Sequence, residues 1–217
     1  MDVYDIAAAL PPVDVLRRRC LALAALDAIV TDGDRFTFAE ADGETTARMD
    51  NGCGDEYDIV FSAAGVFIRG VYHESMMADY HQTLWPGLLA GLPKAFVPYL
   101  LEPRFHSGTM SFEATFVLWR LDGADRWSAG RGIDLSIPEG YEEGTDGSWL
   151  LDPVCDHPVD WYLELAETVY EAFPDRGAVE HVLALLPLDD GIVAALNPSA
   201  DLVDVHTVLT RLGYPGC

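Results

Sequence analysis

The fold is decided by Glu56-Tyr57-Asp58-Ile59-Val60-Phe61-Ser62-Ala63-Ala64-Gly65-Val66-Phe67-Ile68-Arg69-Gly70-Val71-Tyr72. Two runs rich in β-branched and aromatic residues flank a short turn that contains glycine. This pattern is typical of a β-hairpin. We therefore predict two antiparallel strands, 56–61 and 66–72, that form the centre of a sheet.

Further strands are predicted on both sides of the hairpin. Residues 35–38 alternate between polar and apolar, and residues 112–120 are apolar and rich in β-formers. We expect 112–120 to join the sheet of the hairpin. The polar segment 42–54 is predicted to be a loop. The Gly- and Asp-rich segment 121–148 is predicted to be a long loop with one short strand near 133–137.

Helices are predicted before and after these strands. From Asp14 to Val30, apolar residues recur every three or four positions, which is typical of an amphipathic helix. A second helix is expected to open at Pro93 and to be interrupted by Pro98, because proline removes a backbone donor. Four more helices are predicted in the last third, at 158–173, from 175, from 189 or 190 to 197, and from 199 to 213.

Together these elements predict an α+β fold. Its antiparallel sheet has a central hairpin covered by an N-terminal helix, and a helical C-terminal half follows. We treat 1–217 as a single domain with a soft internal boundary near residue 150. The boundary separates an α+β part, 1–150, from a helical part, 151–217, and no linker rich in Pro, Ser and Gly divides them.

The composition indicates a soluble, strongly acidic protein. The chain has 36 acidic and 13 basic residues, a formal net charge of -23, which disfavours binding to nucleic acid or to an anionic membrane. The acidic N-terminus lacks the basic region of a secretory signal, and the most apolar stretch, Cys20–Val30, is too short to span a bilayer. We therefore expect a cytoplasmic location. The four cysteines are widely spaced and form no CxxC pair, so the sequence predicts neither disulfides nor a structural metal site.

The negative charge has two explanations. It can be a background property, such as a GC-rich genome or adaptation to high salt. It can also form an acidic face that captures a basic protein, because such a field accelerates encounter by about ten- to a thousandfold. Two tryptophans border the Gly- and Asp-rich loop, where they either anchor the loop or serve as interface hot spots. The predicted partner-binding residues are Trp127, Glu142, Glu143, Asp146 and Trp149.

Another polar cluster lies at the open end of the hairpin. Asp55 and Glu56 enter the hairpin and His73 and Glu74 leave it, so strand pairing brings them to one edge. A histidine beside carboxylates can act as an oriented general base, and the carboxylates can bind a hard cation. Alternatively, these residues hydrogen-bond the backbone at the strand ends. The candidate catalytic residues are Asp55, Glu56, His73 and Glu74.

The common catalytic motifs are absent from the sequence. It contains no GxSxG, HExxH, Walker-type or GxGxxG motif. We therefore assign no cofactor and no metal.

Several short strings resemble those of a family of uncharacterised bacterial cytosolic proteins. The resemblance is carried by Asn51-Gly52-Cys53-Gly54-Asp55-Glu56-Tyr57, His73-Glu74-Ser75, Trp85-Pro86-Gly87 and the ending Leu212-Gly213-Tyr214-Pro215. The family has no assigned activity, so the resemblance implies a bacterial cytosolic location and assigns no functional residue.

Three hypotheses for the function follow. The leading one is a non-catalytic acidic binding protein, an inhibitor, immunity-type or regulatory partner of a basic protein. The competing one is a hydrolase-type enzyme whose site lies at the hairpin mouth, with His73 as the base. The third is a sensor of a small molecule or a metal.

Overall fold

The computed structural model describes residues 1–31, 33–78, 84–106, 112–136, 146–156 and 158–216. The chain divides into two compact units. The first comprises Met1–Leu10 and Glu40–Asp152, and the second comprises Pro11–Ala39 and Pro153–Cys217. The boundary expected near residue 150 lies close to one junction. The segment Pro11–Ala39, which we expected in the first part, belongs to the second unit.

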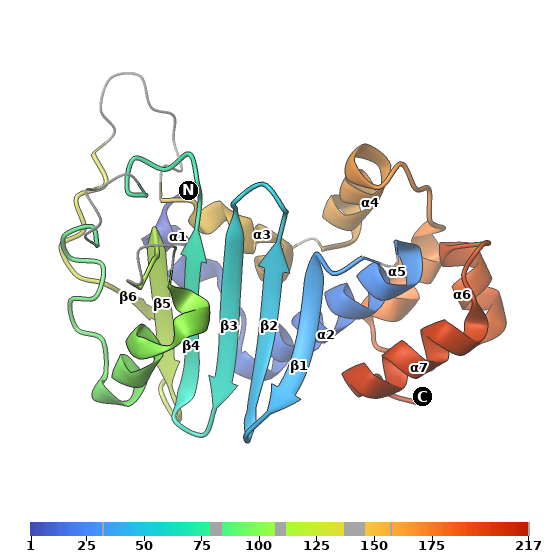
Figure 1. Ribbon diagram of the computed structural model, residues 1–217, viewed down its shortest axis with the longest axis horizontal. Helices are drawn as coiled ribbons and strands as arrows, with labels where there is room; N and C mark the ends of the chain where they lie inside the picture. Colours follow the sequence, from blue (N-terminus) through green and yellow to red (C-terminus); the bar gives the residue numbers. More distant parts are fainter. Residues whose placement is uncertain (32, 79–83, 107–111, 137–145, 157, 217) are drawn as a thin grey trace. The chain divides into compact units, whose positions relative to one another are not determined.

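The first unit is built around an antiparallel sheet with strand order β1-β2-β3-β4-β5-β6, which confirms the predicted α+β class (Figure 1). Strand β1 (Phe36–Ala41) spans the junction of the two units. The other strands are β2 (Glu44–Asp50), β3 (Glu56–Ser62), β4 (Gly65–Val71), β5 (Phe116–Leu121) and β6 (Ser128–Ala129).

The predicted central hairpin is confirmed. Strands β3 and β4 pair in antiparallel register up to Ser62 opposite Gly65, and β5 joins β4 as predicted. Gly65 has a φ of 126°, and a Cβ there would lie 2.1 Å from the carbonyl oxygen of Arg120. Only glycine therefore allows β5 to approach the turn this closely.

Two loop predictions were wrong. Residues 44–50 form strand β2, in which Thr45, Ala47 and Met49 are buried and the side chains between them are half-buried. This period of two is that of a strand with two unlike faces. The short strand expected near 133–137 is not formed at 133–136, and β6 lies upstream of it. Ile137 lies outside the described residues.

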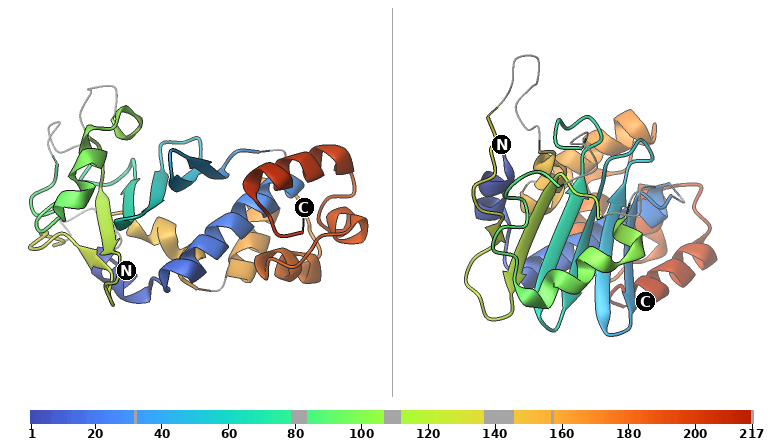
Figure 2. Two further views of the ribbon diagram at one scale, coloured as in Figure 1. Left: turned by 90° about the horizontal axis from the view of Figure 1, so that it is seen from below. Right: turned by 60° about the vertical axis from the view of Figure 1, so that its left-hand side comes forward.

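Different elements cover the two faces of the sheet within the first unit. Helix α1 (Val3–Ala9), which sequence analysis did not predict, contacts β5 and β6. The 3₁₀ helix η1 (Lys94–Leu101) places Tyr99 on the ring of Phe67, with ring centroids 5.1 Å apart. Figure 2 shows η1 and α1 on opposite sides of the sheet. Two shorter 3₁₀ helices are η2 (Pro103–Phe105) and η3 (Ser148–Leu151).

The second unit is helical, and it confirms the predicted helix 14–30 and the four predicted C-terminal helices. Helix α2 (Val13–Val30) contacts α5, α6 and α7. The helices that follow are α3 (Asp152–Cys155), which crosses the junction, α4 (Pro158–Val169), α5 (Arg176–Leu183), α6 (Asp190–Leu196) and α7 (Leu202–Leu212). Across the described ranges, no helix combines the length and the apolarity that crossing a membrane requires.

The buried carboxylate of Asp27 and the side-chain amide of Asn197 form hydrogen bonds with segments distant in sequence. The carboxylate of Asp27 accepts the hydroxyl of Tyr170 at 2.6 Å and the backbone N–H of Phe36 at 3.2 Å. The side-chain amide of Asn197 donates to the carbonyl of Ile29 at 2.9 Å. These bonds tie α2 to the C-terminal helices that pack on it.

Candidate functional site

Asp55 and His73 form a hydrogen-bonded pair at the open end of the β3–β4 hairpin. Nδ1 of His73 lies 2.7 Å from Oδ1 of Asp55, and the backbone N–H of His73 donates to the same oxygen at 3.0 Å. The side-chain amide of Asn51 donates to the other carboxylate oxygen at 2.7 Å. We call Asn51, Asp55, Tyr72, His73 and Glu74 the hairpin-mouth cluster.

The β2–β3 loop holds this pair in place. The side-chain oxygen of Asn51 accepts the backbone N–H groups of Cys53 and Asp55, at 2.8 and 3.1 Å, which closes the loop. Gly54 has a φ of 103°, and a Cβ there would lie 3.1 Å from Cβ of His73. The loop backbone is therefore packed directly against the histidine.

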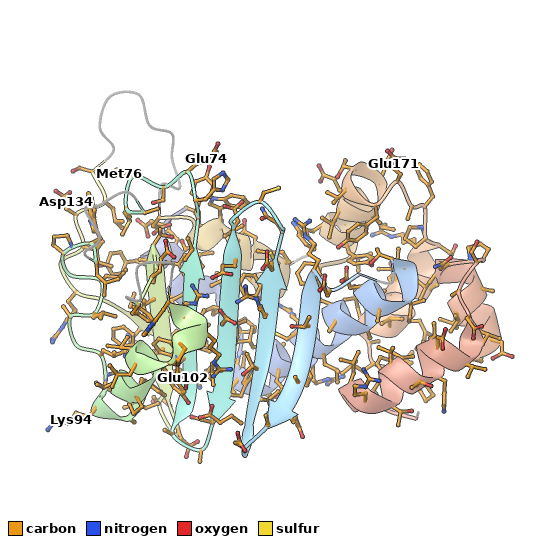
Figure 3. The ribbon with its side chains drawn as sticks, viewed as in Figure 1. Glu74, Met76, Lys94, Glu102, Asp134 and Glu171 are labelled. Carbon is orange, nitrogen blue, oxygen red and sulfur yellow. The ribbon has the colours of Figure 1, made fainter. Side chains whose placement is uncertain are left out.

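The surroundings favour the charged form of His73. The hydrogen bond that the His73 ring donates to the Asp55 carboxylate raises the pKa of His73 above its ordinary value of 6.5, and the negative charge of Glu74 adds to this effect. Nε2, the other ring nitrogen, lies 4.0 Å from Oε1 of Glu74. The hydroxyl of Tyr72 donates to Oε2 of Glu74 at 2.9 Å, and Glu74 lies beyond the end of β4 (Figure 3). Such an exposed, oriented imidazole can transfer a proton or present a positive charge.

Glu56 lies away from this cluster, although sequence analysis placed it there. Its carboxylate bonds to the guanidinium groups of Arg48 and Arg69. Successive strand residues point to opposite faces, so Asp55 and Glu56 diverge. The prediction that Glu56 shares a site with His73 is therefore corrected.

Glu56 belongs instead to a charge network on one face of the sheet. Cross-strand pairing places Asp58 between Arg48 and Arg69. Arg69 is only 1% exposed, and its Nε donates to Asp58 at 3.0 Å while Nη1 donates to the carbonyl of Glu113 at 3.2 Å. Burial raises the pKa of Asp58, and the two guanidinium groups oppose this rise. The network is fully engaged within the fold, which indicates a structural role.

Asp146, one of the predicted partner-binding residues, is buried and cannot contact a partner at the surface. It is 1% exposed, and its carboxylate accepts the N–H groups of Val3 at 2.7 Å and Ser148 at 3.0 Å. Its own carbonyl accepts the hydroxyl of Thr115 at 2.7 Å. Asp146 therefore ties the start of the chain to the sheet, and its prediction as a contact residue is corrected.

The two tryptophans of the predicted binding surface differ. Trp127 is buried, with the guanidinium of Arg120 5.9 Å from its ring centroid, which fits the anchoring alternative. Trp149 is 40% exposed and meets the ring of Tyr72 edge-on, with centroids 5.7 Å apart. Glu142 and Glu143 lie outside the described residues.

A surface feature missed by sequence analysis lies on α4. Asp160, Glu164 and Glu167 are exposed and spaced by four and three residues, which places them on one side of the helix. We call these three residues the acidic stripe. Arg176 bonds Asp160 at 2.6 Å, but neither glutamate forms an ion pair with a described residue. The spacing is visible within the predicted helix 158–173, so charge patterning could have found it.

Comparisons of the chain with family models, with curated proteins and with solved structures find no match. Among the side chains that the structure describes, no group of three or more His, Cys, Asp and Glu residues is arranged to hold a metal ion. The candidate features of the described surface considered so far are the hairpin-mouth cluster, Trp149 and the acidic stripe.

Proposed function

We propose that the protein is a non-catalytic binding protein that docks a basic protein through its surface carboxylates, above all through the acidic stripe. The observation that carries this proposal is the repulsion between Glu164 and Glu167 on α4, which form no ion pair with a described residue, whereas Asp160 is paired with Arg176. Like charges three or four residues apart destabilise a helix by about 0.2–0.5 kcal/mol per pair. Helix α4 has no basic residue in its last turn to offset them. A cationic partner surface removes this repulsion.

The positions of the arginines support the same proposal. Arg48 and Arg69 are engaged in the internal network. Arg18 and Arg19 donate to backbone carbonyls of the C-terminal helices, among them the carbonyl of Val154 at 2.9 Å. These cations stabilise the fold and leave surface carboxylates in excess, which suits electrostatic steering of a basic protein.

Affinity capture tests this proposal. The immobilised chain is exposed to bacterial lysate at low salt, and retained proteins are released at 1 M salt, where the Debye length is about 3 Å. We expect the released proteins to be basic. The double variant E164Q/E167Q should retain less of them, whereas the control D122N/D125N, which removes two exposed carboxylates from another turn, should not. Retention of no basic protein, or equal loss in both variants, contradicts the proposal.

A second candidate function is favoured by one observation, the bond of 2.7 Å between Asp55 and His73. In a hydrolase, Asp55 would orient the imidazole so that Nε2 accepts a proton from water or a nucleophile. Assays with chromogenic ester and amide substrates separate the two candidates. Turnover that is lost in H73Q and reduced in D55N supports the enzyme. Turnover that is absent from the wild type, or unchanged in H73Q, eliminates it.

A further inference from the structure

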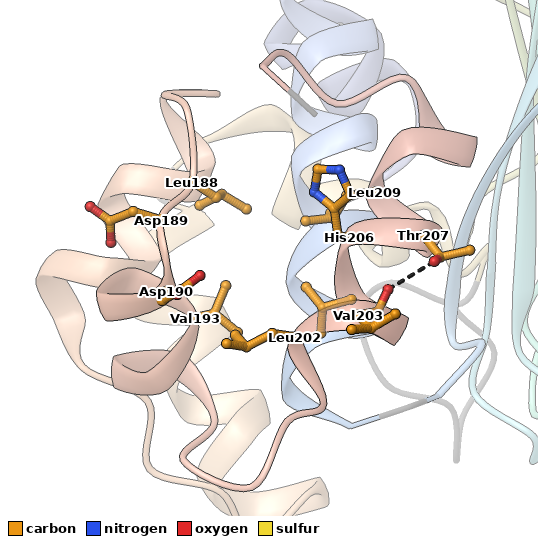
Figure 4. Close-up of a pocket in the computed structure, with 10 residues that line it drawn as sticks. Leu188, Asp189, Asp190, Val193, Leu202, Val203, His206, Thr207 and Leu209 are labelled. Carbon is orange, nitrogen blue, oxygen red and sulfur yellow. Dashed lines mark hydrogen bonds between the residues drawn. The ribbon is translucent and has the colours of Figure 1, made fainter.

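A groove lies between α6 and α7 in the second unit, with a volume of about 430 Å³ (Figure 4). Its walls are largely aliphatic, and Leu188 and Val193 come from the α6 side while Leu202 and Leu209 come from α7. Leu202 is 43% exposed and its neighbour Val203 is 73% exposed. A concave apolar site of this size is within the range of ligand pockets.

The charge around the groove selects its occupant. Asp189 and Asp190 are exposed at its rim, and its described lining contains one histidine but no lysine or arginine. Asp201 and Asp204 are exposed at the start of α7. A second copy of this chain would bring the same carboxylates and a net charge of -23, which opposes self-association.

We infer that this groove receives the apolar side of a basic amphipathic helix from the partner. The inference rests on the proposed function and adds to the acidic stripe a second contact surface and the chemistry of the partner segment that occupies it. Leucine-like side chains at spacings of three and four residues insert between α6 and α7, as in other helix-in-groove complexes. Lysines or arginines beside them face the rim carboxylate of Asp190, whereas the carboxylate of Asp189 caps α6 by accepting the backbone N–H of Ile192 at 2.9 Å.

Three synthetic peptides of about 14 residues, roughly four helical turns, test this inference on the full chain. One has leucines on one side and lysines on the other, the second has glutamates in place of the lysines, and the third has serines in place of the leucines. Binding is followed by methyl NMR of labelled leucine and valine. We expect the leucine–lysine peptide alone to shift the methyl signals of Val193, Leu202 and Leu209.

Matched variants make the test specific to the groove. L202S should weaken binding of the leucine–lysine peptide by about tenfold, as expected for loss of an apolar anchor. D190N should weaken it by about two- to fivefold, as expected for an exposed ion pair. The controls are L186S and D125N, which change a similarly exposed leucine and an exposed carboxylate outside the groove lining, and they should leave the affinity unchanged.

The outcomes separate this inference from the function on which it rests. Binding of the leucine–lysine peptide with shifts outside the groove overturns the groove assignment but retains a cation-binding protein. Equal binding of the leucine–glutamate peptide overturns the charge argument. Failure of both lysine peptides to bind at low salt overturns the inference and counts against the proposed function as well.

Discussion

Arg69→Met removes the cation from an ion network that is buried in the sheet. Asp58 is 3% exposed and bonds to Nη2 of Arg69 at 2.9 Å, so the substitution leaves a buried carboxylate without its main partner. Breaking a buried pair in this way costs about 3–5 kcal/mol. That is a large fraction of the roughly 5–15 kcal/mol by which a typical domain is stable.

Arg104→Met is the matched control. Its guanidinium lies 4.6 Å from the ring centroid of Phe105, against 5.2 Å for Arg69, so both variants lose a similar cation–π contact. Arg104 pairs with Glu102 at 2.5 Å at an exposed position. An exposed pair contributes no more than about 1 kcal/mol. The difference between R69M and R104M in lost free energy of unfolding therefore measures the cost of leaving buried, rather than exposed, carboxylates without their cation.

Urea unfolding followed by circular dichroism and tryptophan fluorescence measures both losses. The double variant R69M/D58L should recover most of the stability lost in R69M, because it removes the uncompensated charge along with the cation. Equal losses in R69M and R104M would refute this reasoning. A double variant less stable than R69M alone would refute it as well.

The loss in R69M should also depend on pH. Burial already raises the pKa of Asp58, and without Arg69 the rise becomes larger. A carboxyl whose pKa is raised by folding stabilises the folded state below its unfolded pKa of about 3.9, and this contribution is lost as the pH rises through the folded pKa. The free energy of unfolding that R69M loses relative to the wild type should therefore be largest at neutral pH and should shrink as the pH falls toward 4.

Three further predictions concern other parts of the chain. D55N should lower the pKa of His73 toward 6.5, because the bonded carboxylate charge is lost; an unchanged NMR titration would contradict this. Gly70→Ala should lower the free energy of unfolding by roughly 1–3 kcal/mol through overpacking, since the new Cβ would lie 2.0 Å from the buried ring of Phe116. An unchanged midpoint of urea unfolding would contradict this prediction. E164Q should raise the stability of α4 by about 0.2–0.5 kcal/mol at low salt, a gain that thermal unfolding should show fading at 1 M salt; destabilisation at low salt would argue against repulsion in the stripe.

The hairpin could be predicted from sequence because both of its strands are apolar and its turn contains glycine. Strand β2 was missed because one of its faces belongs to the charge network, so Arg48 and Asp50 give it the composition of a loop. Its period of two was nevertheless present. Polar content alone is therefore a poor guide to loops where a sheet face carries ion pairs.

The candidate site was predictable only as far as strand pairing determines it. Strand pairing brings Asp55 close to His73, and the alternation of side chains along the strand separates Glu56 from both of them. The burial of Asp146 depends on Val3, which lies 143 positions away in sequence. No local pattern encodes such a contact, because it arises only when the tertiary structure forms.

The second unit combines an early segment of the chain with its last third, and this affects folding on the ribosome. Asn197 reaches Ile29 across 168 positions of sequence. At about 5–20 residues per second, helix α2 is made roughly 9–36 s before the last of the helices that pack on it is complete. The apolar side of α2 stays uncovered by these helices during that interval, so the nascent chain exposes apolar surface that the finished protein buries.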